Sequence, residues 1–124
     1  MITAKHFTES EFKRCTPSCS LQDMNQETMN RLERAREIAG IPFVLNSAYR
    51  SPEWEHDHDR TGDGSHPHRR AVDIRCNTYQ NRMKIVSALL KAGFRRIGIG
   101  RTYIHVDDDP TKTQDVIWDY YENA

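Results

Sequence analysis

The chain has 124 residues, of which 36% are hydrophobic and 29% are charged, so it has the size of one domain with a single core and a polar surface. Its 18 basic and 18 acidic residues cancel, which argues against partners recognised through overall charge, such as nucleic acid or an anionic membrane. No stretch has the apolar length of a membrane span, and the first residues lack the apolar core of a signal peptide. We therefore expect one monomeric domain over residues 1–124, made in the cytoplasm without a signal peptide.

The cysteine count is odd. Cys15 and Cys19 are close enough in sequence to pair, but free thiols fit a reducing compartment better. Neither has a histidine or a further cysteine beside it, which argues against a second metal site. Cys76 follows an apolar strand and is expected to belong to the core.

The first half of the chain predicts two helices and a strand. Thr8 and Glu11 have the spacing of a capping box, which indicates a short helix through residues 12 and 13. Residues 27–39 have apolar side chains along one side of a helix, and Gly40 ends it. Residues 43–45 then read as a short strand.

The second half alternates strands with one long helix. Residues 71–74 form an apolar run broken by one acid, the pattern of a mostly buried strand. Thr78 caps a helix over residues 79–92. Residues 95–100 and 103–107 predict a hairpin, and glycines in the first of these strands leave a bare face for close packing. The aromatic tail, residues 116–121, is left open between strand and helix.

Residues 64–74 place a histidine and a carboxylate where they can act together. Glycine and proline favour an irregular loop that presents His66, and the following strand presents Asp73 among apolar residues. A buried carboxylate needs an ion pair, hydrogen bonds or a cation. We interpret His66 and Asp73 as two ligands of one metal. The alternative is that Asp73 pairs with Arg69 or Arg70 and that His66 is a surface residue.

The strand at residues 103–107 supplies a third ligand. Strand alternation puts Tyr103, His105 and Asp107 on one face and the two aliphatic residues on the other. With His105 the set becomes His/Asp/His, which suits zinc with its fourth position left for water. Asp107 would then lie beside that water and act as general base.

Other polar residues compete for these roles. His56 and His58 lie in an acidic loop without a strand to hold them, so they rank below the chosen ligands. His68 lies two residues from His66 and competes with it, but His66 alone has a gap of six residues to Asp73. Residues 57–63 imitate the first half of a calcium loop. His68 stands where an EF-hand requires glutamate, which excludes an EF-hand but leaves a looser calcium site open.

These segments together resemble a known family. The matching runs are His6 to Phe12, Asn46 to Pro52, Ser65-His66 through Ala71-Val72-Asp73-Ile74, and Ile104-His105-Val106-Asp107. In this order they resemble the zinc D-alanyl-D-alanine metallopeptidases, which share a fold with the sonic hedgehog signalling domain, and especially the small members from phages and bacteria. The resemblance covers about residues 6 to 109.

The resemblance implies a function. It implies zinc bound by His66, Asp73 and His105, with Arg50 holding a substrate carboxylate as a planar guanidinium does well. Ser65 belongs to the matching run and is carried over as a further substrate contact. Tyr103, on the same face of its strand as His105, is expected to contact the substrate as an oxyanion donor. The implied substrates are peptidoglycan or its peptide precursors. The implied activity is that of a carboxypeptidase or endopeptidase of the cell wall, such as an endolysin, which acts once exported or released.

The expected architecture is α+β, with a small, mainly antiparallel sheet that carries the metal on one face and two main helices on the other. Two positions depart from the family pattern. Arg69 replaces a glycine, and Thr102 stands where other members have an acidic base. The assignment of the base to Asp107 therefore rests on strand geometry and on the His-x-Asp variant. The competing function is a zinc-stabilised module that binds cell wall, or forms part of a virion, without catalysis.

Overall fold

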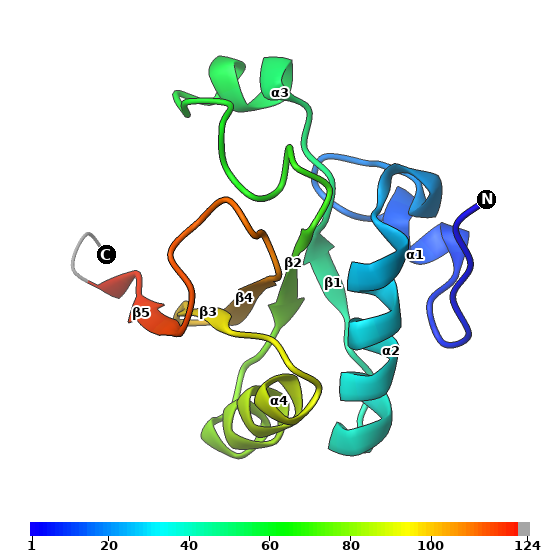
Figure 1. Ribbon diagram of the computed structural model, residues 1–124, viewed down its shortest axis with the longest axis vertical. Coiled ribbons are helices and arrows are strands. Elements are labelled where there is room, and N and C mark those ends of the chain that lie inside the picture. Colours follow the sequence, from blue (N-terminus) through cyan, green and yellow to red (C-terminus); the bar gives the residue numbers. More distant parts are fainter. Residues whose placement is uncertain (122–124) are drawn as a thin grey trace.

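The computed structural model describes residues 1–121 and shows an α+β protein built around one five-stranded sheet (Figure 1). In chain order the elements are α1 (Glu9–Lys13), the 3-10 helix η1 (Leu21–Asp23), α2 (Gln26–Ala39), β1 (Leu45–Ser47), α3 (Pro52–Asp57), β2 (Ala71–Arg75), α4 (Tyr79–Lys91), β3 (Arg96–Ile99), β4 (Tyr103–Asp107) and β5 (Val116–Asp119). Within residues 1–121, no helix is long and apolar enough to cross a membrane.

The structure confirms the residues that were predicted to begin or end the helices. Thr8 and Glu11 form the capping box of α1, and the Thr78 side chain accepts a hydrogen bond from the Asn81 amide at the start of α4. Gly40 follows α2 in the left-handed conformation, with φ 70°, which glycine adopts without the steric cost that other residues pay.

Two elements differ from the prediction. The segment after residue 51, expected to be a loop, begins with the helix α3, because Ser51 caps it and Pro52 occupies its first turn. The strand expected at residues 43–45 begins only at Leu45, since β1 pairs with β2 through Leu45 and Ser47 with an irregularity between them.

The strand order is β1-β2-β4-β3-β5. All neighbours are antiparallel except β3 and β5, which are parallel. The sheet is therefore mainly antiparallel, as predicted. The aromatic tail that the sequence left open is a strand at the sheet edge.

The helices α2 and α4 lie side by side and cover one face of the sheet (Figure 1). Each of the central strands β2 and β4 sends aliphatic side chains into this layer. The fully buried residues of the core include Phe12, Met29, Leu32, Phe43, Val72, Ile74, Ile85, Leu89, Phe94, Ile97, Ile104 and Val106. Cys15, Cys19 and Cys76 are also buried. The opposite face of the sheet is left for polar side chains.

One row of paired residues crosses the polar face of the sheet. The register pairs Ser47 with Asp73, Asp73 with His105, His105 with Gly98, and Gly98 with Trp118. Cross-strand partners have side chains on the same face. The row therefore fixes, from one edge to the other, which groups are neighbours at the site.

Candidate active site

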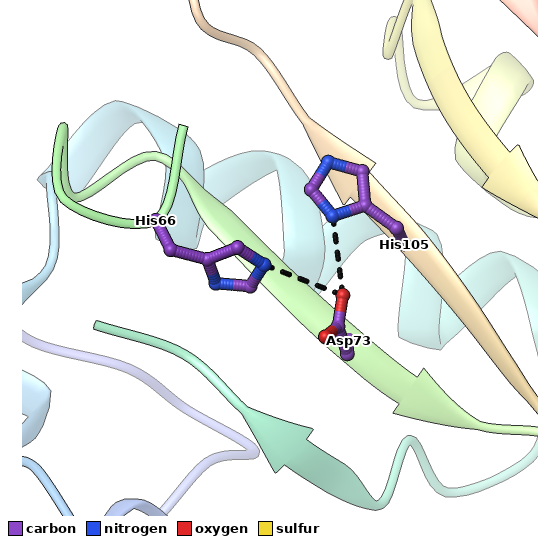
Figure 2. Close-up of side chains that lie close together, drawn as sticks. All are labelled: His66, Asp73 and His105. Carbon is purple, nitrogen blue, oxygen red and sulfur yellow. Dashed lines mark hydrogen bonds and ion pairs between the residues drawn. The ribbon is translucent and has the colours of Figure 1, made fainter. Parts of the chain in front are cut away.

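The three predicted metal ligands meet above the centre of the sheet (Figure 2). Asp73 and His105 are opposite each other on β2 and β4, and His66 reaches them from the loop that precedes β2. Asp73 Oδ1 lies 3.4 Å from His66 Nε2 and 3.1 Å from His105 Nδ1. One ligand atom from each residue lies within 4.8 Å of the others, a spacing that suits a shared metal ion.

His66 is held with one ring nitrogen bare. Its Nδ1 donates to the carbonyl oxygen of Ala48 at 2.6 Å, which assigns the proton to Nδ1. Its Nε2 is buried and has no hydrogen-bond partner among residues 1–121. A buried lone pair without a partner is costly. This atom fits a metal ligand, because a cation at the cluster would satisfy it.

His105 is held in the corresponding way from the other side. Its Nε2 donates to Asp107 Oδ2 at 2.7 Å, while its Nδ1 faces Asp73. Burial alone would lower the pKa of His105, but hydrogen bonds to Asp107 and Asp73 outweigh it and raise the pKa to about 9. Burial would likewise raise the pKa of Asp73. The neighbouring rings of His105 and His66 prevail and hold that pKa well below its usual value.

Asp107 lies on the face of His105, as strand alternation predicts, but its carboxylate contacts the His105 ring and does not face the open space over the cluster. Its side chain is completely buried behind His105. Its Oδ1 accepts from Arg96 Nε at 2.7 Å and from the Asp109 amide at 3.1 Å. Burial would raise the pKa of Asp107, but His105 and Arg96 lower it on balance. Both oxygens are engaged, so the carboxylate orients the His105 ring.

A cavity of about 680 Å³ opens over the cluster. Its lining combines the metal-ligand residues with cations and aromatic rings: Arg50, Arg60, Gly64, Ser65, His66, Asp73, Arg96, Tyr103, His105, Lys112, Trp118 and Tyr120. Asp73 is the only carboxylate in this lining among the residues that the structure describes.

The predicted substrate contacts Arg50, Ser65 and Tyr103 all line this cavity. Arg50 follows β1 and is largely buried. Its Nε lies 3.2 Å from Glu55 Oε2, and its Nη1 lies 3.9 Å from Asp73 Oδ2. Burial lowers the pKa of Arg50, with Asp73 and Glu55 acting in the opposite direction. Burial and the charge of Asp73 raise the pKa of Tyr103.

The alternative partners for Asp73 are excluded by the geometry. Arg70 pairs with Asp108, its Nε lying 3.0 Å from Oδ1. Arg69 has φ 69° and places its guanidinium 4.5 Å from the ring centre of Tyr49. Neither arginine contacts Asp73.

The competing histidines also have other partners. His68 Nδ1 lies 2.8 Å from Asp109 Oδ2, His56 contacts the Thr61 carbonyl, and His58 stacks on Trp54. None of the three belongs to the His66 cluster.

Several residues that line the cavity or contact its lining were not predicted from the sequence. Glu55, which holds Arg50, lies on the unexpected helix α3, and Trp118 and Tyr120 come from the tail. The bare face of β3 was the available signal for the two rings. A Cβ added at Gly98 would lie 2.8 Å from atoms of both Trp118 and Tyr120, so the glycine is needed for their close approach.

Two histidines and an aspartate meet at an open cavity, and each histidine is fixed through its outer nitrogen. Such a group could hold a metal ion and is typical of metal-dependent enzymes. A family model described as peptidase M15 matches residues 5–107. The chain belongs to this family, the zinc D-Ala-D-Ala carboxypeptidase type, which confirms the resemblance drawn from the motifs. Comparisons with curated proteins and with solved structures give no significant match.

Proposed function

We propose that this chain is a single-domain, monomeric zinc peptidase that hydrolyses peptide bonds in bacterial cell-wall peptides, with zinc bound by His66, Asp73 and His105. The observation that carries the metal site is the buried Nε2 of His66, which has no hydrogen-bond partner in the described part of the chain and faces the carboxylate of Asp73. The cell-wall substrate follows from the family resemblance. Action on the wall then requires that the protein be exported, or released by lysis as an endolysin is.

The residues around the proposed zinc position have separate roles. Zinc, when bound, supplies a Lewis acid that acidifies water and polarises a carbonyl. The Ala48 carbonyl and the Asp107 carboxylate fix the outer nitrogens of His66 and His105, so each ring would present its other nitrogen to a bound metal. Tyr103 and Ser65 line the cavity and offer hydroxyl donors to the substrate.

Arg50 favours release of a C-terminal residue. Its Nη1 lies 3.9 Å from Asp73 Oδ2, next to the proposed metal position. One extended residue spans about 3.3–3.6 Å, so a carboxylate bound by Arg50 belongs to the residue next to the cleaved bond. A carboxypeptidase acting on a free terminal carboxylate is therefore the form of the activity that this geometry supports best.

One observation favours a second candidate, a zinc-stabilised module that binds cell-wall peptides without cleaving them. The only carboxylate lining the cavity within residues 1–121 is Asp73, a proposed metal ligand, and Asp107 is occupied by His105 and Arg96. A peptidase normally needs a group that accepts a proton from water. A binding module does not.

The test is mass spectrometry of zinc-loaded protein incubated with purified peptidoglycan and with a synthetic peptide that ends in D-Ala-D-Ala. The synthetic peptide is supplied as free acid and as C-terminal amide. We expect the free acid to lose one residue and the amide to react far more slowly. Arg50→Gln should abolish this preference, and exposed Arg101→Gln should keep it.

Intact substrates in the presence of one bound zinc per chain would reject the enzyme and leave the binding module. Cleavage at internal bonds, with acid and amide reacting equally, would reject the carboxypeptidase form alone. His66→Ala serves as the control for zinc dependence.

A further inference from the structure

The edge strand β5 lies outside the segment that matches the family. The match ends at residue 107, the last residue of β4. Lys112, Trp118 and Tyr120 come after this point, and all three line the cavity. One wall of the cavity is therefore built by a part of the chain that the family match does not cover.

The rings on this wall are held in place beside the metal-ligand residues. Gly98 stands between His105 and Trp118 in the cross-strand row and carries no side chain. The ring centres of Trp118 and His105 are therefore 5.6 Å apart although a strand separates them. The guanidinium of Arg96 lies 4.9 Å from the Trp118 ring centre, and the Tyr120 and Tyr103 ring centres are 5.6 Å apart.

The row also gives the substrate a direction. Arg50 contacts Ser47 at the β1 end, Asp73 and His105 lie in the middle, and Trp118 lies at the β5 end. A peptide with its carboxylate on Arg50 and its cleaved bond over the middle must continue toward β5. Two strand intervals of 4.7–4.9 Å separate β4 from β5, about 10 Å, which is roughly the length of three extended residues.

We propose that Trp118 and Tyr120 form the binding wall for the roughly three substrate residues on the amino side of the cleaved bond, and thereby set the preferred substrate length. This inference rests on the proposed function, because the direction comes from Arg50 and the metal ligands. Partly exposed aromatic rings suit such a wall, since they offer a large apolar contact area at low conformational cost.

The experiment compares two peptides that end in D-Ala-D-Ala. The acetylated dipeptide has one residue on the amino side of the cleaved bond, and the longer peptide has two more residues there, three in all. Trp118→Ala should lower kcat/KM for the longer peptide by about tenfold or more, mainly through KM, and leave the dipeptide nearly unchanged. Trp118→Phe should retain most of the activity. The matched control is Ile117→Ala, because Ile117 is exposed on the opposite face of the same strand.

A purely structural role for Trp118 would lower turnover of both peptides equally and reduce zinc content, and this result would overturn the proposal. The proposal would also be overturned if Trp118→Ala turned over each peptide at the wild-type rate. Zinc content is measured for every variant.

The proposal stays testable if the wild type cleaves neither peptide. The chain has two tryptophans, so Trp54→Phe leaves Trp118 as the only one. Fluorescence of this variant should change on titration with the longer peptide and not with the dipeptide. No change with either peptide would reject the binding wall, whereas a change without cleavage would reject only the peptidase.

Discussion

At the scale of single residues, the outer nitrogens of the two histidines decide what the site can do. His66 donates to a backbone carbonyl and His105 to a buried carboxylate, so each ring has its outer nitrogen fixed and its other nitrogen directed at Asp73. Such partners orient metal-binding rings and raise their basicity. Asp107 thus contributes by holding His105.

Replacing Asp107 with asparagine tests this role. An amide keeps the shape of the carboxylate but removes its charge. Its NH₂ group would face either His105 Nε2 or Arg96 Nε, both of which donate hydrogen bonds to Asp107, so one of these bonds would be lost. We expect zinc affinity to fall about 10–100-fold, the typical effect of losing such a partner. Competition with a chromophoric chelator measures it.

The control for this variant is Asp57→Asn, the same exchange at an exposed position of α3. If Asp107→Asn kept wild-type zinc affinity and lost only turnover, the holding role would be wrong and the general-base assignment would return.

The sequence identified the residues of the cluster but not every contact among them. The spacing of His66, Asp73 and His105 in the sequence was sufficient to group them, because one loop and two paired strands bring them together whatever their side-chain rotamers. Strand alternation correctly put Asp107 on the face of His105. It could not show that the carboxylate turns toward the ring nitrogen, because that depends on side-chain rotamers and on Arg96 from another strand.

At the scale of elements, the pairing of β3 with β5 connects a glycine to the shape of the cavity. Gly98→Ala would place a Cβ 2.8 Å from Trp118 and Tyr120 atoms, so both rings would have to shift. We expect turnover of long peptides to fall, with zinc affinity unchanged because no ligand moves. Kinetics and zinc titration on one preparation check this. A matched fall for short and long peptides would contradict it.

The loops around the cavity are joined by Asp109. It accepts hydrogen bonds from Thr111 and contacts Nδ1 of His68. The other ring nitrogen of His68, Nε2, lies 3.3 Å from Asp63 Oδ1 in the same loop. Burial alone would raise the pKa of Asp109, but the bonds from Thr111 and His68 outweigh it and hold the pKa well below its usual range.

A depressed carboxyl pKa stabilises the folded state above the unfolded pKa of about 4 and loses that contribution as pH falls below it. Asp109→Asn should therefore lower the urea midpoint at pH 6, and the gap to wild type should shrink at pH 3. A gap that stayed constant between these pH values would assign the effect of the substitution to packing.

The sequence predicted those helices and strands whose signals are local. Caps and glycines predicted α2 and α4, since those signals act within one turn. The helix α3 was missed although Ser51-Pro52 is a helix start, because its polar composition resembled a loop. The state of β5 depended on pairing with a strand about twenty residues earlier, which no local pattern contains.

At the scale of the whole molecule, the metal would connect three separate parts of the chain. His66 comes from a loop, Asp73 from β2 and His105 from β4, and His66 Nε2 is buried without a hydrogen-bond partner among residues 1–121. A ligand that binds only the folded state stabilises it by RT ln(1 + [L]/Kd). Zinc binding and folding are therefore expected to be linked.

Zinc at about 100 times its Kd should stabilise the fold by about 2.7 kcal/mol. For a chain of this size each kcal/mol raises Tm by roughly 3–5 °C, so we expect EDTA to lower Tm by about 10 °C in thermal unfolding followed by circular dichroism. The shift should vanish in His66→Ala and persist in His56→Ala, because His56 contacts the Thr61 carbonyl and does not belong to the His66 cluster. An equal Tm with and without EDTA would mean that the His/Asp/His group forms a structural ion pair, since a bound metal cannot leave stability unchanged.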